Sequence, residues 1–241
     1  MQFKRGLEWY GRIFQHIPTD KLAMEKSVYF DMKESPQRMM DILGKNVKLI
    51  VVVKDPVQRV IGEYSFWKSK NSTDRIETHS TFSDCVFIRE NGQLSINASY
   101  EPIPKSDYGS CLQDFFDVGF DLSNFIFIDG DRLARDPAPE VLKLEKALGL
   151  RPMFTEDMFY FNATRGFPCL KSNIYFADGS KSVKRGGCME EECGRSHPFV
   201  SDEEKELLYR FYAPKNRKFF KMIQMEFPNW FCYDKNKCIF E

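Results

Sequence analysis

Five side chains that carry positive charge, or can acquire it, stand next to turns that the sequence predicts. They are Lys26, Lys54, Arg59, Arg195 and His197. The last two belong to a Gly-Arg-x-His turn, whose backbone N–H groups, guanidinium fork and imidazole together suit a phosphate or sulfate group. Each cation alone is more often a solvated surface charge, so the residue types leave both interpretations open.

The apolar run 47–53 leads directly into one of these turns. A continuous β-branched run that ends in Lys54-Asp55-Pro56 is typical of a buried parallel strand followed by a helix. Open α/β sheets bind ligands beyond the carboxyl ends of their strands. Lys54 and Arg59 also place two cations beside a helix N-terminus, so this turn is a candidate phosphate site.

Missing motifs exclude several other kinds of site. The sequence has no Gly-x-x-x-x-Gly-Lys-Ser/Thr loop, no Gly-x-Gly-x-x-Gly, no His-Glu-x-x-His and no Gly-x-Ser-x-Gly. With 3 His we expect neither a metal hydrolase nor a bound metal. The 35 basic residues balance 35 acidic ones, so the net charge neither indicates nor excludes a polyanion partner. We expect no nucleic-acid partner.

Cysteines and glycosylation sequons point to a cellular compartment. Cys169 and Cys188 flank the polar segment 171–187, and Cys232 and Cys238 flank a short polar loop; both spacings suit local disulfides. Three Asn-x-Ser/Thr sequons begin at positions 71, 97 and 162. These features favour a secretory compartment, and a cytosolic protein with free thiols is the alternative. Residues 1–6 do not form a signal peptide, and no apolar stretch is long enough for a membrane helix.

Helical patterns and apolar runs alternate along the chain. We expect helices over 6–17, 35–43, 56–67, 81–89, 108–116 and 136–149, and a long last helix opened by a capping box at 201–204. We expect strands over 21–30, 47–53 and 124–129, and a turn at 130–132. This alternation predicts βαβ units and a mostly parallel sheet. The polar connection 68–105 is long enough to carry a binding function.

Four segments give the chain a specific resemblance. Residues 54–64 resemble the pattern Arg-Asp-Pro-x-x-Arg-x-x-Ser-x-Tyr, and residues 129–140 resemble the strand–turn–helix beyond it. Residues 159–170, and Cys188 with residues 194–198, match the two sides of a disulfide loop. Through these segments the chain resembles the heparan sulfate glucosamine 3-O-sulfotransferases over nearly its entire length.

The resemblance implies a fold and a reaction. The fold would be an α/β three-layer sandwich with a mostly parallel central sheet, related to P-loop kinases, in a single sulfotransferase domain over residues 1–241. The donor would be 3′-phosphoadenylyl sulfate, and the acceptor the 3-hydroxyl of glucosamine in a heparan sulfate chain. A base would take the hydroxyl proton while the oxygen attacks sulfur in line, and cations would stabilise the leaving phosphate. The location would be the Golgi lumen or outside the cell.

The resemblance also gives roles to particular residues. Those matching the donor site are Lys54, Arg59, Gly62, Cys193, Gly194, Arg195, Ser196 and His197. Those matching the acceptor site are Glu25, Lys26, Ser27 and Gln113, of which Lys26 would also support catalysis. Cys169 and Cys188 would form the disulfide of the family.

The sequence departs from the family pattern at several of these positions. Lys54 replaces an Arg, which keeps the charge but loses the bidentate fork. Gly62 stands where the family has a Ser whose hydroxyl binds the 3′-phosphate, and Cys193 stands where a Lys precedes Gly-Arg. The acceptor segment also lacks the Pro-Ala pair after Ser27.

The family has further functional residues upstream of the region matched by residues 6–10. These are a Lys-rich loop for the 5′-phosphosulfate and the catalytic Glu, and residues 1–6 supply neither. We therefore expect a fold without its first βα unit, no identifiable catalytic base, a membrane anchor only outside this sequence, and no sulfate transfer by this chain alone. Three hypotheses remain: part of an enzyme, a non-catalytic heparan-sulfate-binding or structural relative, and a nucleotide-dependent transferase with different donor chemistry.

Overall fold

The computed structural model describes residues 6–18, 21–27, 30–72, 75–76, 79–175, 181–183, 186–188, 196–234 and 237–239. The α-helices of this part are α1 (Gly6–Phe14), α2 (Ser35–Leu43), α3 (Pro56–Ser69), α4 (Phe82–Val86), α5 (Pro102–Lys105), α6 (Tyr108–Asp117), α7 (Gly130–Leu133), α8 (Pro137–Ala147) and α9 (Asp202–Ile223). The strands are β1 (Leu49–Val53), β2 (Phe87–Glu90), β3 (Gln93–Ile96), β4 (Phe125–Asp129), β5 (Phe159–Asn162), β6 (Phe167–Leu170), β7 (Ile174–Tyr175), β8 (Lys181–Val183), β9 (Cys232–Asp234) and β10 (Lys237–Cys238).

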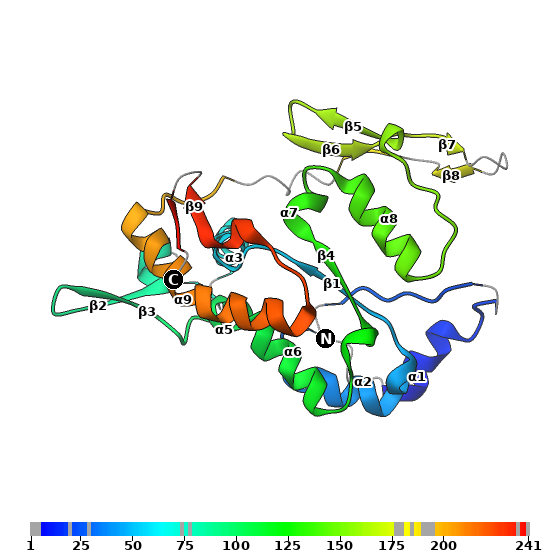
Figure 1. Ribbon diagram of the computed structural model, residues 1–241, viewed down its shortest axis with the longest axis horizontal. Coiled ribbons are helices and arrows are strands. Elements are labelled where there is room, and N and C mark those ends of the chain that lie inside the picture. Colours follow the sequence, from blue (N-terminus) through cyan, green and yellow to red (C-terminus); the bar gives the residue numbers. More distant parts are fainter. Residues whose placement is uncertain are drawn as a thin grey trace.

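A parallel pair of strands, β1 and β4, forms the centre of the molecule. The register runs from Leu49 opposite Phe125 to Val53 opposite Asp129, so both strands end at the same edge. Helices α7 and α8 lie on one side of this pair, and α6 and α9 lie on the other (Figure 1). The α/β class and the parallel pairing predicted from the two apolar runs are therefore confirmed.

The two strand ends approach each other closely. Gly130 follows β4 directly, and a Cβ atom added there would lie 2.8 Å from the carbonyl oxygen of Val53. Only glycine fits this position without a backbone shift, because real Cβ contacts are not this short. The close approach places the turn after β4 beside the turn after β1.

Two groups of buried side chains fix the helices around the strands. In one, Phe219 of α9 packs its ring against Phe127 of β4 and Tyr108 of α6. In the other, Val60 of α3 and Leu208 of α9 are both fully buried. Helix α9 therefore holds both the sheet and the helix that follows β1, and its predicted capping box is present at Ser201 and Glu204.

The remaining strands form antiparallel pairs outside the central pair: β2 with β3, β5 with β6, β7 with β8, and β9 with β10. Two predictions were wrong here. Residues 21–27 contain no strand, and residues 28–29 lie outside the described part. The helix expected over 81–89 ends at Val86, because the chain then enters the β2–β3 hairpin. Asn91 and Gly92 both have positive φ at its tip (49° and 79°), and Asn-Gly is the strongest short hairpin signal.

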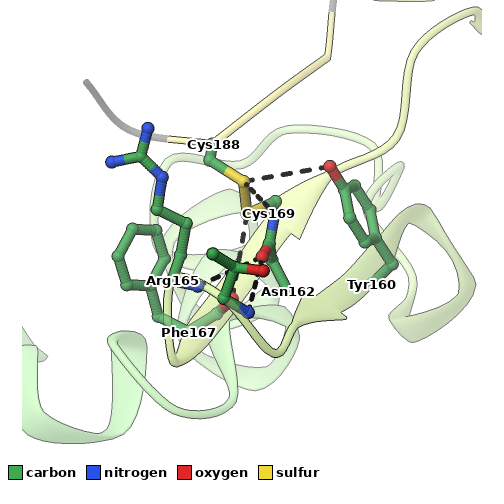
Figure 2. The surroundings of a disulfide bond; sticks show 7 residues. Tyr160, Asn162, Arg165, Phe167, Cys169 and Cys188 are labelled. Carbon is green, nitrogen blue, oxygen red and sulfur yellow. Dashed lines mark hydrogen bonds between the residues drawn. A yellow bond between two sulfur atoms is a disulfide. The ribbon is translucent and has the colours of Figure 1, made fainter. Parts of the chain in front are cut away.

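The disulfide Cys169–Cys188 that the resemblance implies is present, and the structure also pairs Cys232 with Cys238, which the sequence left open. Cys169 in β6 is bonded to Cys188, and Cys232 is bonded to Cys238. Figure 2 shows how Asn162 and Tyr160 of β5 approach the first disulfide: the Asn162 amide donates to the Cys188 sulfur at 3.3 Å, and the Tyr160 hydroxyl lies 3.8 Å from the same sulfur. Leu170 and Gly187 form a β-bridge, so the disulfide closes the loop against β6.

Candidate functional site

The turn between β1 and α3 is built around Asp55, which is 5 % exposed. Its carboxylate accepts hydrogen bonds from the backbone N–H of Val57 (2.8 Å) and Gln58 (3.4 Å), and from the hydroxyl of Tyr209. The backbone N–H of Asp55 donates to the carboxylate of Asp131 in α7 (3.1 Å). Burial raises the pKa of Asp55 to about 7, although the hydrogen bonds act in the opposite direction.

The N-terminal N–H groups of α3 are all occupied. Pro56 has none, Val57 and Gln58 donate to the Asp55 side chain, and Arg59 donates to the Asp55 carbonyl oxygen at 2.8 Å. The phosphate that the sequence predicts at this turn stays a prediction, and the backbone N–H groups of this helix end already have acceptors. Donors for an anion must therefore come from side chains around the turn.

Lys54 and His197, predicted from distant parts of the sequence, lie within electrostatic range of each other beside α3. The backbone of Lys54 is fixed by Tyr108, whose hydroxyl accepts from the Lys54 N–H (3.2 Å) and donates to the Lys54 carbonyl oxygen (2.9 Å). Reduced hydration of the ring and, second, the charge of Lys54 lower the pKa of His197. The imidazole Nδ1 also lies 3.5 Å from the hydroxyl of Ser65 in α3.

Gly62 lies on the same side of α3 as Ser65, because the two are three residues apart. No atom lies within 4 Å of a Cβ added at Gly62, so a side chain there would enter open space. The hydroxyl of Ser65 donates to the carbonyl oxygen of Ile61 at 2.9 Å. Ser65 was not predicted from the sequence as a residue of this site. The one signal for it was its position three residues after Gly62, on the same side of the helix.

Arg59 sits in a network of ion pairs. Its guanidinium contacts the carboxylates of Asp31 (3.1 Å) and Glu63 (3.4 Å), and donates to the Ser106 hydroxyl (2.9 Å). Lys105 adds a second cation 3.8 Å from Asp31. The pKa of Glu63 is raised, mainly because its carboxyl group is buried. Asp31 was not singled out in the sequence, since it follows no recognisable motif.

The predicted acceptor residues lie on two different elements. Glu25, Lys26 and Ser27 belong to the exposed segment 21–27, where Glu25 accepts a hydrogen bond from the Tyr10 hydroxyl. Gln113 is half-buried on α6 and donates to Asp117 at 2.8 Å.

The predicted donor loop is described only in part. Ser196 is exposed, whereas Cys193, Gly194 and Arg195 lie outside the described residues. Their roles therefore stay predictions. Of the parts of this loop named from the sequence, His197 is the one that the structure places beside α3.

The described residues hold no group of three or more His, Cys, Asp or Glu side chains arranged to bind a metal ion. Within that part of the chain, no helix is both long and apolar enough to cross a membrane. The candidate site is the turn at the carboxyl edge of the parallel β pair, with Lys54 as its cation and His197, whose pKa is lowered, as a nearby imidazole. We call it the donor corner, after the donor residues predicted there. The fold and the position of this turn are those of α/β proteins that bind ligands beyond the carboxyl ends of parallel strands.

Comparison with known proteins makes the class specific. The family described as "Sulfotransferase domain" matches residues 3–219, and the chain belongs to this family. A sulfotransferase from Alicyclobacillus acidocaldarius has the same fold, with a TM-score of 0.58 and 18% identity over 94% of this chain and 74% of that chain.

Among curated proteins, the chain is similar to mouse heparan sulfate glucosamine 3-O-sulfotransferases 3B1 and 6. Each is 35% identical over 93% of this chain, which corresponds to 54% and 61% of their own lengths. The human 3-O-sulfotransferase 5 is 30% identical over 91% of this chain and 60% of its own length. The chain thus spans little more than half the length of these relatives.

Proposed function

We propose that this domain binds 3′-phosphoadenylyl sulfate and serves sulfate transfer to the 3-hydroxyl of glucosamine in heparan sulfate. The single observation that carries the donor part is the position of Lys54 directly after a parallel strand, with His197 beside the helix that follows and within electrostatic range. An ammonium group and an imidazole N–H donor beside a rigid turn suit a phosphate dianion. The acceptor part is supported by the similarity to glucosamine 3-O-sulfotransferases.

The structure supports different tasks for the two predicted cations of residues 54–64. Lys54 has no recorded ion pair among the described residues, so its ammonium group can meet the 3′-phosphate. Arg59 already contacts two carboxylates and a hydroxyl, so we assign it to holding α3 against Asp31. Its contribution to the donor site would be to keep the turn in place rather than to touch the nucleotide.

In the proposed reaction, the sugar oxygen attacks sulfur and the bond between sulfur and the phosphate oxygen breaks. Adenosine 3′,5′-bisphosphate leaves, and the sugar proton passes to a base that none of the residues named here supplies. Lys54 and His197 would bind the end of the nucleotide away from the transferred group, which is a positioning task. Glu25, Lys26, Ser27 and Gln113 would line the acceptor side.

Two features of the chain fit a protein that works in the lumen of the secretory pathway. They are the disulfides Cys169–Cys188 and Cys232–Cys238, and disulfides form and persist mainly in oxidising compartments. We therefore propose a Golgi or secreted location for this single domain. Glycosylation of the sequons stays a prediction. In the structure, the side-chain amide of Asn97 donates to the Cys85 carbonyl oxygen and that of Asn162 to the Cys188 sulfur, so these two amides are already in use.

A non-catalytic relative that binds heparan sulfate is the second candidate. It is favoured by Gly62, which has no hydroxyl where the family has a phosphate-binding Ser, and by Lys54, which lacks the bidentate fork of the family's Arg. The two candidates differ in nucleotide affinity, because only the first needs the turn after β1 to hold a phosphate.

Calorimetric titration with adenosine 3′,5′-bisphosphate tests the proposal. We expect the nucleotide to bind, and adenosine 5′-monophosphate to bind at least tenfold more weakly because it lacks the 3′-phosphate. Lys54→Met should weaken binding by about 1.5 kcal/mol, the lower value for a hydrogen bond to a charged group. Lys146→Met removes an exposed cation on α8 and serves as the control, with unchanged affinity.

Two results would contradict the donor site. One is equal affinity for both nucleotides, and the other is an equal effect of Lys54→Met and Lys146→Met. Arg195→Ala extends the test to the donor loop, where the sequence predicts a loss of about 1.5–3 kcal/mol. A protein that binds heparan sulfate but neither nucleotide would be the non-catalytic relative.

A further inference from the structure

A cavity of about 720 Å³ opens on the surface at the C-terminal end of α9. Its apolar lining comes from Phe220, Met225 and Phe231, and its cationic lining from Arg217 and Lys221. Helix α9 provides one wall, and the short 3-10 helix Pro228–Phe231 provides the other. None of the residues assigned above to the donor or the acceptor lines this cavity.

The cations of this cavity belong to a larger basic face. Lys218 and Lys221 are exposed and three residues apart, and Arg217 precedes Lys221 by four, so all three project from one side of α9. The guanidinium of Arg217 lies 5.4 Å from the centre of the Phe231 ring, which holds it at the cavity. We call these three residues the α9 basic face.

The charges of the α9 basic face have no recorded acidic partner within the described part of the chain. Lys215, one turn earlier, differs in this respect because it pairs with Asp107 at 2.7 Å. The carboxylate of Glu226 also lines the cavity. Because Arg217 and Lys221 outnumber it, the lining residues still carry a net positive charge.

Helix stability does not account for the three cations together. The helix dipole favours a cation in the last turn, which explains Lys221. Like charges three and four residues apart repel each other, so Arg217 and Lys218 beside Lys221 weaken the helix. A cost in stability, beside a cavity with an apolar floor, indicates a ligand that carries several negative charges and apolar faces.

We propose that this cavity binds a sulfated segment of a glycosaminoglycan chain, as a second site outside the donor and acceptor regions. Sulfate groups would pair with the α9 basic face, and the C–H faces of the sugar rings would lie on Phe231 and Met225. The choice of a polysaccharide rests on the proposed function.

The second site is separated from the donor corner by a distance that a single polysaccharide chain can bridge. Tyr209, which contacts Asp55, is 14 residues before Ile223, and a helix of that length spans about 21 Å. A polymer that engages both regions binds more tightly than either region alone would allow. The α9 basic face would then keep the enzyme on the polymer between turnovers.

The test measures binding of a fluorescent heparin dodecasaccharide to the whole chain at several salt concentrations. The variant Lys218→Glu/Lys221→Glu should bind at least fivefold more weakly at 0.1 M salt, with a shallower dependence of affinity on salt because fewer counterions are released. Glu226→Gln should bind more tightly. The control Lys33→Glu/Lys146→Glu makes the same charge change at exposed sites elsewhere and should bind like the wild type.

Several outcomes would overturn the second site. They are absence of dodecasaccharide binding by the wild type, equal losses in the two double variants, and stronger competition by anionic lipid vesicles or a poly-glutamate peptide than by the dodecasaccharide. Adenosine 3′,5′-bisphosphate titrations separate this failure from that of the proposed function. The α9 double variant should keep the nucleotide affinity of the wild type, whereas Lys54→Met should lower it.

Discussion

Replacing Gly62 with Ser is the most direct test of the donor corner. The position lies in α3 on the side of Ser65, and no atom lies within 4 Å of an added Cβ. The substitution therefore adds a hydroxyl to open space without displacing a neighbour. If the 3′-phosphate binds between Lys54 and α3, the new hydroxyl gains a hydrogen bond to a charged group.

The size of the effect follows from two separate terms. A hydrogen bond to a charged group contributes about 1.5–3 kcal/mol, and we expect the lower value because Gly62 is partly exposed. This value corresponds to about tenfold tighter binding of adenosine 3′,5′-bisphosphate. Ser also has a better helix propensity than Gly by about 0.5 kcal/mol, so the free energy of unfolding should rise slightly.

Gly62→Ala is the matched control, because it improves helix propensity by about 1 kcal/mol and adds no donor. Calorimetry should therefore show tighter nucleotide binding for Ser alone, while thermal unfolding shows higher stability for both variants. Adenosine 5′-monophosphate should bind equally to all three proteins, since it has no 3′-phosphate. Equal nucleotide affinities of the Ser and Ala variants would refute the assignment of Gly62 to the 3′-phosphate.

Three further predictions concern stability. The pKa of Asp55 is raised from 3.8 to about 7, so between these pH values the folded state binds more protons than the unfolded state, and the free energy of unfolding should fall as the pH rises from about 4 to about 7. Urea titrations should show a flatter pH dependence for Asp55→Asn. Gly130→Ala should cost about 1–3 kcal/mol in the same assay, since its Cβ would meet the Val53 carbonyl oxygen, and a neutral result would show that the turn can move. Cys169→Ser should lower the free energy of unfolding by about 3 kcal/mol and Cys232→Ser by about 2 kcal/mol, because a disulfide that closes 19 residues restricts the unfolded chain more than one that closes 6. The reverse order in guanidinium titrations would contradict this argument.

The central elements could be predicted because their sequences carry strong local signals. The run that becomes β1 is β-branched and ends at a Lys-Asp-Pro break, and β4 is an equally apolar run. Ser201 opens α9 with a capping box that the structure reproduces. In each case local propensity and burial favour the same structure, so tertiary packing had nothing to override.

Other parts could not be predicted because their structure depends on distant contacts. The segment 21–30 has a strand-like composition, but residues 21–27 belong to no strand. The ion pair between Arg59 and Asp31 joins residues 28 positions apart, and no spacing rule connects them. The β2–β3 hairpin was available to sequence reasoning, since Asn91-Gly92 marks its turn, but the helical pattern before it was extended too far.

The turn after β1 shows why charge and geometry must be considered separately in this protein. Asp55 occupies the N–H groups at the start of α3 and is itself held by Tyr209, so the turn has a fixed shape whether or not an anion is present. The affinity for a phosphate must then come from side chains, of which Lys54 supplies charge and Gly62 supplies nothing. Because the turn is fixed but Gly62 offers no hydroxyl, it should still prefer a nucleotide with a 3′-phosphate over one without, while binding it weakly. Restoring a hydroxyl at position 62 should therefore change affinity without changing which nucleotide is preferred.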